Sequence, residues 1–258
     1  MRYGVLSDIH GNLPALDAVL TALDAHRPDA ILCAGDLVGY GAFPNECTER
    51  IASVATACVA GNHDLVAIGR QPEALLDDFG AETNRWTRSV LDEPARAYLE
   101  GLPLQLEVDG IVLAHGSLHD PWRYVGPRSA ETELSRLATE RPGARVLVLG
   151  HTHAPLAYCE DVGAAVTDEP LELVPGRRYL LNPGAVGQSR EALPVARFLV
   201  LDLTDGLASF PSVDYDVERY VADLRKAGLP ADAHHRPPRH GKPSRGWLDR
   251  ALGRRRAR

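Results

Sequence analysis

Residues 3–33, YGVLSDIHGNLPALDAVLTALDAHRPDAILC, combine two kinds of apolar pattern. Short apolar runs of strand length stand at both ends, at residues 3–6 and 30–33. Between them, apolar residues recur at helical spacing, with Asn12 available as a cap and Pro14 in the first turn. These apolar residues are Leu13, Leu16, Val19, Leu20 and Leu23. The stretch predicts a strand, a helix and a second strand.

The same alternation continues toward the middle of the chain. Residues 44–54 carry a helical pattern, and residues 57–60 form a third short apolar run. Strands that alternate with helices of this length are typical of βαβ units, in which the strands are parallel. Residues 3–60 therefore predict an α/β fold built on a parallel sheet.

Helical and strand patterns are mixed in the rest of the chain. Asp109-Gly110 separates two short apolar runs, 104–108 and 111–114, and this predicts a β-hairpin. The other expected elements, in chain order, are mostly helix over 72–101, a helix over 129–139, a buried strand over 146–149, β structure over 156–213 that ends in a strand at 196–203, and a helix over 216–227.

The composition is that of an ordinary globular protein, with 258 residues, 45% hydrophobic and 24% charged. The net charge of −7 argues against a protein built mainly to coat nucleic acid. Residues 231–258 carry nine Lys or Arg and two Asp, which leaves a charge of −14 on residues 1–230. We expect a globular domain over 1–230 and a basic, flexible C-terminal tail over 231–258.

The cysteines and the apolar segments indicate a cytoplasmic protein. None of the four cysteines has C-x-x-C spacing, so neither a zinc knuckle nor a redox dithiol is indicated. Met1 leads directly into a strand-like run, without the pattern of a signal peptide. No apolar stretch approaches the ~20 residues that a membrane span needs.

Polar side chains follow five of the expected strands at the point where each strand ends. They are Asp8 and His10, then Asp36, then Asn62, His63 and Asp64, then His115, then His151 and His153. In open α/β sheets the loops at the carboxyl ends of strands converge on one site. Each residue alone could cap a helix or end a turn, but burying so many polar groups without partners is costly. The joint pattern predicts a functional site.

The types of side chain suggest which metal would bind. Carboxylate, imidazole and amide groups without thiolate suit Mn²⁺, Fe, Zn²⁺, Co²⁺ or Ni²⁺. Four histidines argue against Ca²⁺ or Mg²⁺ alone. The candidate ligands are Asp8, His10, Asp36, Asn62, His115, His151 and His153. They exceed the needs of one ion and would suit two ions about 3.5–4 Å apart that share a carboxylate.

Five short strings in fixed order resemble the calcineurin-like metallophosphoesterase superfamily. They are DIHGN at 8–12, GD at 35–36, GNHD at 61–64, HGS at 115–117 and GHTH at 150–153, and NPGAVGQSR at 182–190 extends the likeness. GDLVGYG at 35–41 with PNE at 44–46 is similar to a bacterial and archaeal branch of small phosphoesterases. The resemblance implies a four-layer α/β/β/α sandwich with two mixed sheets and the metals at their edge.

The resemblance also implies a role for each site residue. Asp8, His10 and His153 would hold one ion, Asn62, His115 and His151 the other, and Asp36 would bridge them. His63 would be the general acid or a stabiliser of the phosphoryl oxygens, and Asp64 would orient it. Asn12 would contact phosphate, against the alternative of a helix cap. Apart from the resemblance, the planar guanidinium of Arg190, beyond the turn at 182–184, would suit phosphate, against the alternative of a surface arginine. His119 and Tyr124 would line the pocket or lie on the surface.

We therefore expect a hydrolase of phosphoric esters in which two divalent ions, with manganese preferred, activate a bridging hydroxide. Diesters, monoesters, phosphoproteins and dinucleoside polyphosphates all remain open as substrates, with diesters or nucleotide-like compounds favoured. The alternatives are a phosphoprotein phosphatase, a nucleic-acid enzyme anchored by its basic tail, and a metal-binding scaffold without turnover. A scaffold relative of this fold lacks the counterpart of His63, which is present here.

Overall fold

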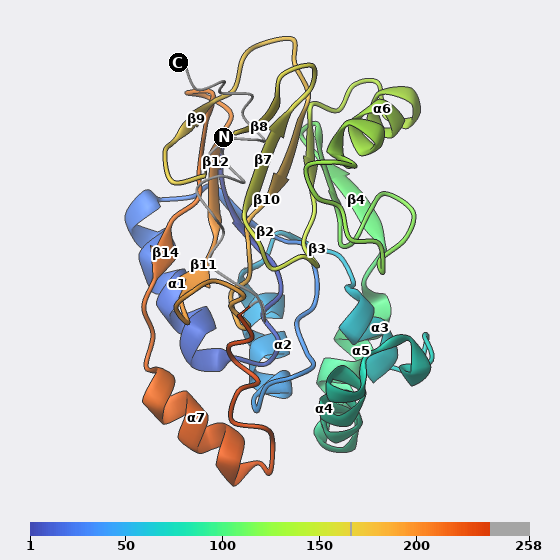
Figure 1. Cartoon of the computed structure of the whole chain (residues 1–258), viewed down its shortest axis with the longest axis vertical. Coiled ribbons are helices and arrows are strands. Elements are labelled where there is room, and N and C mark those ends of the chain that lie inside the picture. Colours follow the sequence, from blue (N-terminus) through green and yellow to red (C-terminus); the bar gives the residue numbers. More distant parts are fainter. Residues whose placement is uncertain (166, 238–258) are drawn as a thin grey trace, which may run out of the picture.

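The computed structural model describes residues 1–165 and 167–237, and within them two six-stranded sheets pack face to face (Figure 1). The first sheet runs in the order β3 (Ala57–Cys58), β2 (Ala30–Cys33), β1 (Arg2–Leu6), β12 (Leu199–Asp202), β13 (Leu207–Ser209), β9 (Leu171–Glu172). The second runs β4 (Gln105–Val108), β5 (Ile111–Ala114), β6 (Val146–Val148), β10 (Tyr179–Asn182), β7 (Leu156–Cys159), β8 (Gly163–Ala165).

The predicted βαβαβ unit forms one half of the first sheet. β1 pairs with β2, and β2 with β3, in parallel, while β12 pairs with β1 in the antiparallel direction. The connecting helices are α1 (Leu13–His26) and α2 (Pro44–Val54), close to the predicted bounds. The third strand is shorter than expected, because the chain leaves the ladder after Cys58.

The second sheet begins with the predicted hairpin of β4 and β5. Asp109 and Gly110 both have positive φ, at 50° and 78°, as the tight turn requires. β5, β6 and β10 are parallel, and β7 runs antiparallel to β10. Helix α6 (Ala130–Glu140) packs on the outer face of this sheet (Figure 1).

Alternate residues along each strand face opposite layers. In β1, Val5 points into the core between the two sheets, and Leu6 points toward the helices on the outer face. In β5, Leu113 joins the same central core, and Val112 joins the layer beneath α6. Both faces of these strands are buried, so they are apolar throughout. The result is the predicted four-layer α/β/β/α sandwich.

One predicted strand is split in two. The expected strand at 196–203 is divided at Phe198 into β11 (Ala196–Arg197) and β12. The Phe198 N–H bonds to the carbonyl of Pro211, and β11 pairs with β14 (Ser212–Val213) instead of following β12 along the first sheet. The buried Phe198 ring lies in the core beside α1.

Short helices gather at the lower end of the molecule in Figure 1. They are α3 (Asn62–Ala67), the 3₁₀ turn η1 (Glu73–Leu75), α4 (Asp78–Val90), α5 (Glu93–Gly101) and, on the other side, α7 (Val217–Lys226). Helical structure over 72–101 and a last helix near 216–227 were both predicted. Pro94 stands in the first turn of α5, where its missing N–H costs nothing.

The chain continues after α7 along the body of the protein. Ala233 is buried beside Leu229 and Tyr220, so the first residues of the predicted tail are packed. Residues 238–258 contain most of the predicted basic tail and lie outside the described residues.

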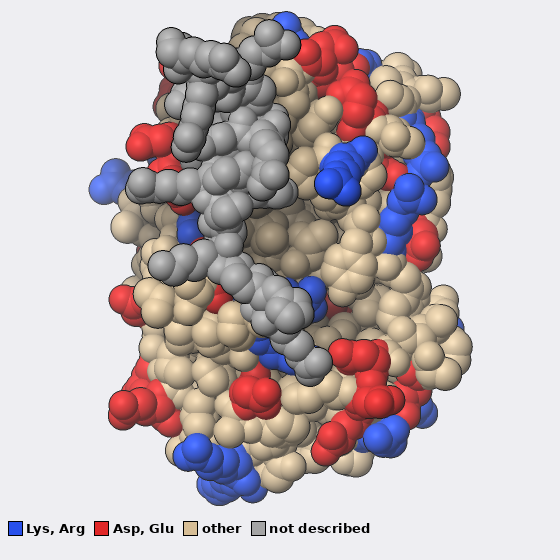
Figure 2. Space-filling model, viewed as in Figure 1, with Lys and Arg blue, Asp and Glu red and all other residues tan. Residues whose placement is uncertain are grey.

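Two surface properties bear on the choice of partners. Where the described residues are visible on the face in Figure 2, the Lys and Arg side chains form separate groups among acidic ones. None of the helices within 1–165 and 167–237 is both long and apolar enough to cross a bilayer.

We expect a Leu32→Ala variant to lose about 2–5 kcal/mol of unfolding free energy, because Leu32 is fully buried between the sheets and the smaller side chain leaves a cavity. Leu193→Ala is the matched control, since Leu193 is 68% exposed and should lose less than about 0.5 kcal/mol. Urea denaturation followed by circular dichroism measures both. Equal losses would contradict the layer assignment.

Candidate metal centre

The loops at one end of the two sheets bring all the predicted ligands together. Asp8 and His10 follow β1, Asp36 follows β2, and Asn62 begins α3. The remaining three, His115, His151 and His153, follow β5 and β6. All seven side chains are buried, with no residue more than 6% exposed. Loops far apart in the sequence therefore form one enclosed polar cluster.

Three of these residues form a first group. Asp8, His10 and His153 each offer one ligating atom, and these atoms lie within 4.8 Å of one another. His153 Nε2 is 3.2 Å from Asp8 Oδ1 and 3.2 Å from His10 Nε2. Two ring nitrogens and a carboxylate oxygen thus face a common point.

A second group lies beside the first. Asp36, His115 and His151 also offer atoms within 4.8 Å of one another. The amide oxygen of Asn62 lies 3.1 Å from His115 Nε2, so it faces the same point. Carboxylate, imidazole and amide donors suit a divalent transition metal.

Asp36 joins the two groups. Its Oδ2 atom lies 3.1 Å from His115 Nε2 in the second group and 3.6 Å from His10 Nε2 in the first. This oxygen is buried and makes no hydrogen bond within the described residues while the His115 ring is neutral, whereas Oδ1 accepts the N–H of His63. A buried carboxylate oxygen without a donor is costly, and a cation on either side would remove that cost. The residues present therefore fit a pair of metal ions.

Backbone carbonyls fix the tautomer of each histidine in the cluster. The contacts are His10 Nδ1 to Val38 O at 3.1 Å, His115 Nδ1 to Ala34 O at 2.8 Å, His153 Nδ1 to Gln188 O at 2.8 Å and His151 Nε2 to Trp122 O at 3.1 Å. A carbonyl can only accept, so the nitrogen that touches it carries the hydrogen. The other nitrogen of each ring faces the cluster, where its deprotonated form would offer a lone pair, as in histidines that bind metal.

Backbone strain is concentrated on the same residues. Five of the seven have positive φ, namely Asp8 at 55°, His10 at 48°, Asp36 at 56°, His151 at 65° and His153 at 57°. This conformation costs a residue with a side chain on the order of 1–3 kcal/mol and is typical of functional sites. Two loops also approach closely here, and only glycine fits at position 35. A Cβ on Gly35 would lie 2.6 Å from the Gly61 nitrogen.

The buried ionisable groups shift one another's pKa values. Burial opposes the charge of Asp36, but the imidazoles of His115 and His63 hold the pKa of this carboxyl well below its usual range. Burial lowers the pKa of His151 to about 3, so its ring is neutral at pH 7. Burial also lowers the pKa of His115, but Asp36 more than offsets it and raises the value to about 10. Metal binding would therefore release a proton from His115.

His63 lies beside the cluster and lines a cavity above it. Its Nδ1 atom has no hydrogen-bond partner in the described part of the chain. Burial lowers the pKa of His63 to about 4, although Asp36 opposes the shift. The ring of Tyr40 packs against it at 4.4 Å between centroids, and Asn84 Nδ2 donates to its carbonyl.

Asp64, expected to orient His63, makes its hydrogen bonds within the described residues with the backbone. Its carboxylate accepts the backbone N–H groups of Asp36, Leu37, Val38 and Gly61 at 2.8–3.1 Å, and none of its hydrogen bonds in this structure reaches the His63 ring. Asp64 instead fixes the loop that carries Asp36 and the Val38 carbonyl.

The predicted phosphate contacts differ in position. Asn12 is fully buried, its Oδ1 accepts from Ala15 N, and its Nδ2 donates to the Gly187 carbonyl. The amide oxygen thus caps α1, as the alternative expected, and the amide nitrogen ties the cap to the loop at Gly187. Arg190 lines the cavity above the cluster. His119 pairs with Glu140 at 2.7 Å, and it is not among the residues that line the cavity.

The cavity above the cluster has a volume of about 340 Å³. Tyr124 is one of its walls, with its ring 4.1 Å from that of His151. Several other lining residues were not predicted, namely Tyr40, Leu75, Leu76, Asp77, Trp122 and Arg236. The string GDLVGYG could have indicated Tyr40, whose φ is 59°, but no motif marked Arg236.

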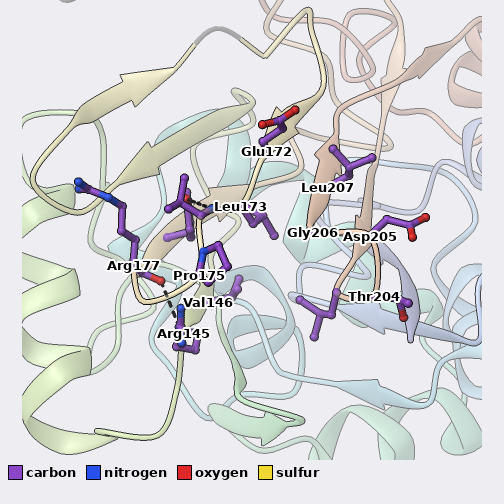
Figure 3. A pocket seen from close by; sticks show the side chains of 13 residues that line it. Arg145, Val146, Glu172, Leu173, Pro175, Arg177, Thr204, Asp205, Gly206 and Leu207 are labelled. Atoms are coloured by element: carbon purple, nitrogen blue, oxygen red, sulfur yellow. Dashed lines mark hydrogen bonds between the residues drawn. The ribbon is translucent and has the colours of Figure 1, made fainter.

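A second cavity, of about 690 Å³, lies at the opposite end of the sheets, beside the first residues of β6 and β10 (Figure 3). Its two arginines both donate to backbone carbonyls. Arg145 Nε donates to the carbonyl of Arg177, and the Arg177 side chain points away from the cavity to the carbonyl of Glu160. This cavity is larger, but the two ligand clusters lie elsewhere.

Similar proteins support the reading of the motifs. MJ0912 of Methanocaldococcus jannaschii is 32% identical over 88% of this chain and 93% of its own length. The crystal structure of a metallophosphoesterase from Sphaerobacter thermophilus has a TM-score of 0.75 and 35% identity, over 90% of this chain and 97% of that one. PH1004 from Pyrococcus horikoshii shares the fold, with a TM-score of 0.74 and 20% identity over 90% and 95%.

The family model matches most of the chain. The model for the calcineurin-like phosphoesterase superfamily domain covers residues 1–206, which include both sheets' central strands and every predicted metal ligand. The order of the motifs, the layered fold and the clustered donors agree with this match. The chain therefore belongs to the calcineurin-like phosphoesterase superfamily.

Proposed function

We propose that the protein is a metal-dependent hydrolase of phosphoric esters that works with two divalent transition-metal ions, with manganese preferred. Asp8, His10 and His153 would hold one ion, Asn62, His115 and His151 would hold the other, and Asp36 would be shared. The observation that carries the proposal is Asp36 Oδ2, a buried carboxylate oxygen that lies between two groups of imidazoles.

The side chains around the cavity complete the proposed chemistry. When bound, two such ions supply charge that makes a water more acidic and offsets the charge on phosphoryl oxygens. His63 would donate a hydrogen bond to a phosphoryl oxygen or a proton to the leaving oxygen. The planar guanidinium of Arg190 matches two phosphate oxygens at once. Asp64 holds the Asp36 loop through backbone amides.

Phosphodiesters and nucleotide-like esters are the substrates that we propose. The cavity combines aromatic rings, Tyr40, Trp122 and Tyr124, with the cationic Arg190. Aromatic faces suit a planar organic group, and a guanidinium suits phosphate. The presence of His63 at the cavity favours turnover over a scaffold role. A cytoplasmic location stays a prediction.

Asp36→Asn should remove metal and activity together, because the amide lacks the charge that two cations would share. We expect about two ions per chain in the manganese-loaded protein by elemental analysis, and a loss of at least one in the variant. Manganese at 100 times its Kd should raise the melting temperature of the metal-free protein by roughly 5–10 °C.

The control for this variant is Asp24→Asn, an exposed carboxylate in α1. It should keep the metal content and the rate on bis-p-nitrophenyl phosphate. If Asp36→Asn retained both ions and near-full rate, the shared position of Asp36 would be wrong.

His63→Ala should keep both ions but lose about 10²–10⁴-fold in kcat, as expected when a proton donor or phosphoryl contact is removed. Elemental analysis and phosphate release under saturating substrate measure the two effects separately. His119→Ala, at an exposed histidine paired with Glu140, should leave both unchanged. Loss of metal from His63→Ala would instead make His63 a ligand.

A further inference from the structure

The chain returns to the mouth of the metal-centre cavity after α7. Ser189 N donates to His234 O, and Arg236 N donates to Ser189 O, both at 3.0 Å. Gln188 Nε2 reaches the Ala233 carbonyl at 3.1 Å, and the His235 ring contacts the Glu191 carbonyl at 2.9 Å. The segment 233–236 is therefore paired with the loop that carries Arg190.

This pairing places the side chain of Arg236 at the cavity. Its guanidinium carbon lies 4.0 Å from the centre of the Phe79 ring, a cation–π contact. Its Nη1 lies 3.6 Å from Asp77 Oδ2, while Asp77 Oδ1 caps α4 through Gly80 N. The backbone bonds and the two side-chain contacts hold Arg236 over the start of α4, with the side chain only 29% exposed.

Arg236 and Arg190 lie where two cavities meet. Another cavity, of about 420 Å³, adjoins the cavity at the metal cluster and is called the outer cavity here. Four residues line both, namely Asp77, Tyr124, Arg190 and Arg236. These four form a throat between the cavity that contains the candidate metal ligands and the outer cavity.

The two guanidinium groups have hydrogen-bonding capacity to spare. Arg190 is partly buried and forms no ion pair with a carboxylate in the described part of the chain. The contact of Arg236 with Asp77 is longer than the roughly 2.7–2.9 Å of a charge-assisted hydrogen bond. Each guanidinium offers five donors. Two carboxylates line the throat and the outer cavity, Asp77 and Asp232. Among the described residues, the one ion pair between them and the two arginines is that of Asp77 with Arg236, at 3.6 Å.

We propose that Arg236 and Arg190 form a second anion subsite, and that the natural substrate carries a second phosphate linked to the one that is hydrolysed. The substrate class is a nucleoside or dinucleoside polyphosphate. The inference rests on the proposed function, in which the metal cluster takes the reacting phosphate. The next phosphate along the chain would then lie at the throat, and the organic group would extend past Tyr124 into the outer cavity.

The reaction consumes one water. A bond forms between the water oxygen and the reacting phosphorus, and the bond from that phosphorus to the bridging oxygen breaks. The bridging oxygen leaves with the second phosphate, and the water proton passes to the products or to solvent.

Steady-state kinetics of Arg236→Gln test the subsite. The substrates are a dinucleoside tetraphosphate and p-nitrophenyl phosphate, with the manganese-loaded full chain. We expect Arg236→Gln to raise the KM for the dinucleoside tetraphosphate at least tenfold more than the KM for p-nitrophenyl phosphate. A hydrogen bond to a charged group has about this effect or more. Arg236→Lys keeps the charge and loses the planar fork, so its KM ratio should lie between those of the wild type and Arg236→Gln. Arg50→Gln, an exposed pair of Asp17, should match the wild type.

Calorimetric binding of pyrophosphate and phosphate gives a second readout. Manganese-loaded wild type should bind pyrophosphate at least tenfold more tightly than phosphate, and Arg236→Gln should lose most of that preference. Equal effects of Arg236→Gln on both substrates and both anions would overturn the subsite. Absence of hydrolysis with every metal would instead overturn the proposed function, while the pyrophosphate titration would still decide the subsite.

Discussion

The central interaction in this structure is the attraction of a buried carboxylate, Asp36, for positive charge. Asp36 Oδ2 lies between His10 and His115, and the nearest possible donor to it in the described structure is the protonated form of His115. Acceptors packed together in a low-dielectric interior repel one another unless a cation or a proton joins them. Much of the surrounding fold serves to keep them in place despite that repulsion.

The supporting interactions come mainly from the backbone. Asp64 draws four amides onto one carboxylate, which stiffens the turn that carries Asp36. Carbonyl oxygens from loops of both sheets orient the imidazoles, so each ring depends on a neighbouring loop. The left-handed residues are held by these contacts, which compensate for the strain at each position. A site built in this way is rigid before any ligand arrives.

The strands and their polar ends could be predicted because doubly buried strands are short apolar runs, and parallel strands present their carboxyl ends together. The break at Phe198 could not, because the apolar run is continuous and the partner at 212–213 is chosen by tertiary packing. Arg236 lies in a stretch rich in His, Pro and Arg that resembles a tail. Only its pairing with Ser189 shows that it is part of the site.

The pairing of segment 233–236 with the Ser189 loop adds late residues to a site whose candidate metal ligands all come earlier in the sequence. The family model ends at residue 206 and includes every candidate metal ligand, whereas Arg236 at the throat comes from a later segment. During synthesis the first part can fold while the rest is still being made, and the entrance takes shape last. A change in segment 233–236 would therefore alter the entrance to the cavity without replacing any candidate metal ligand.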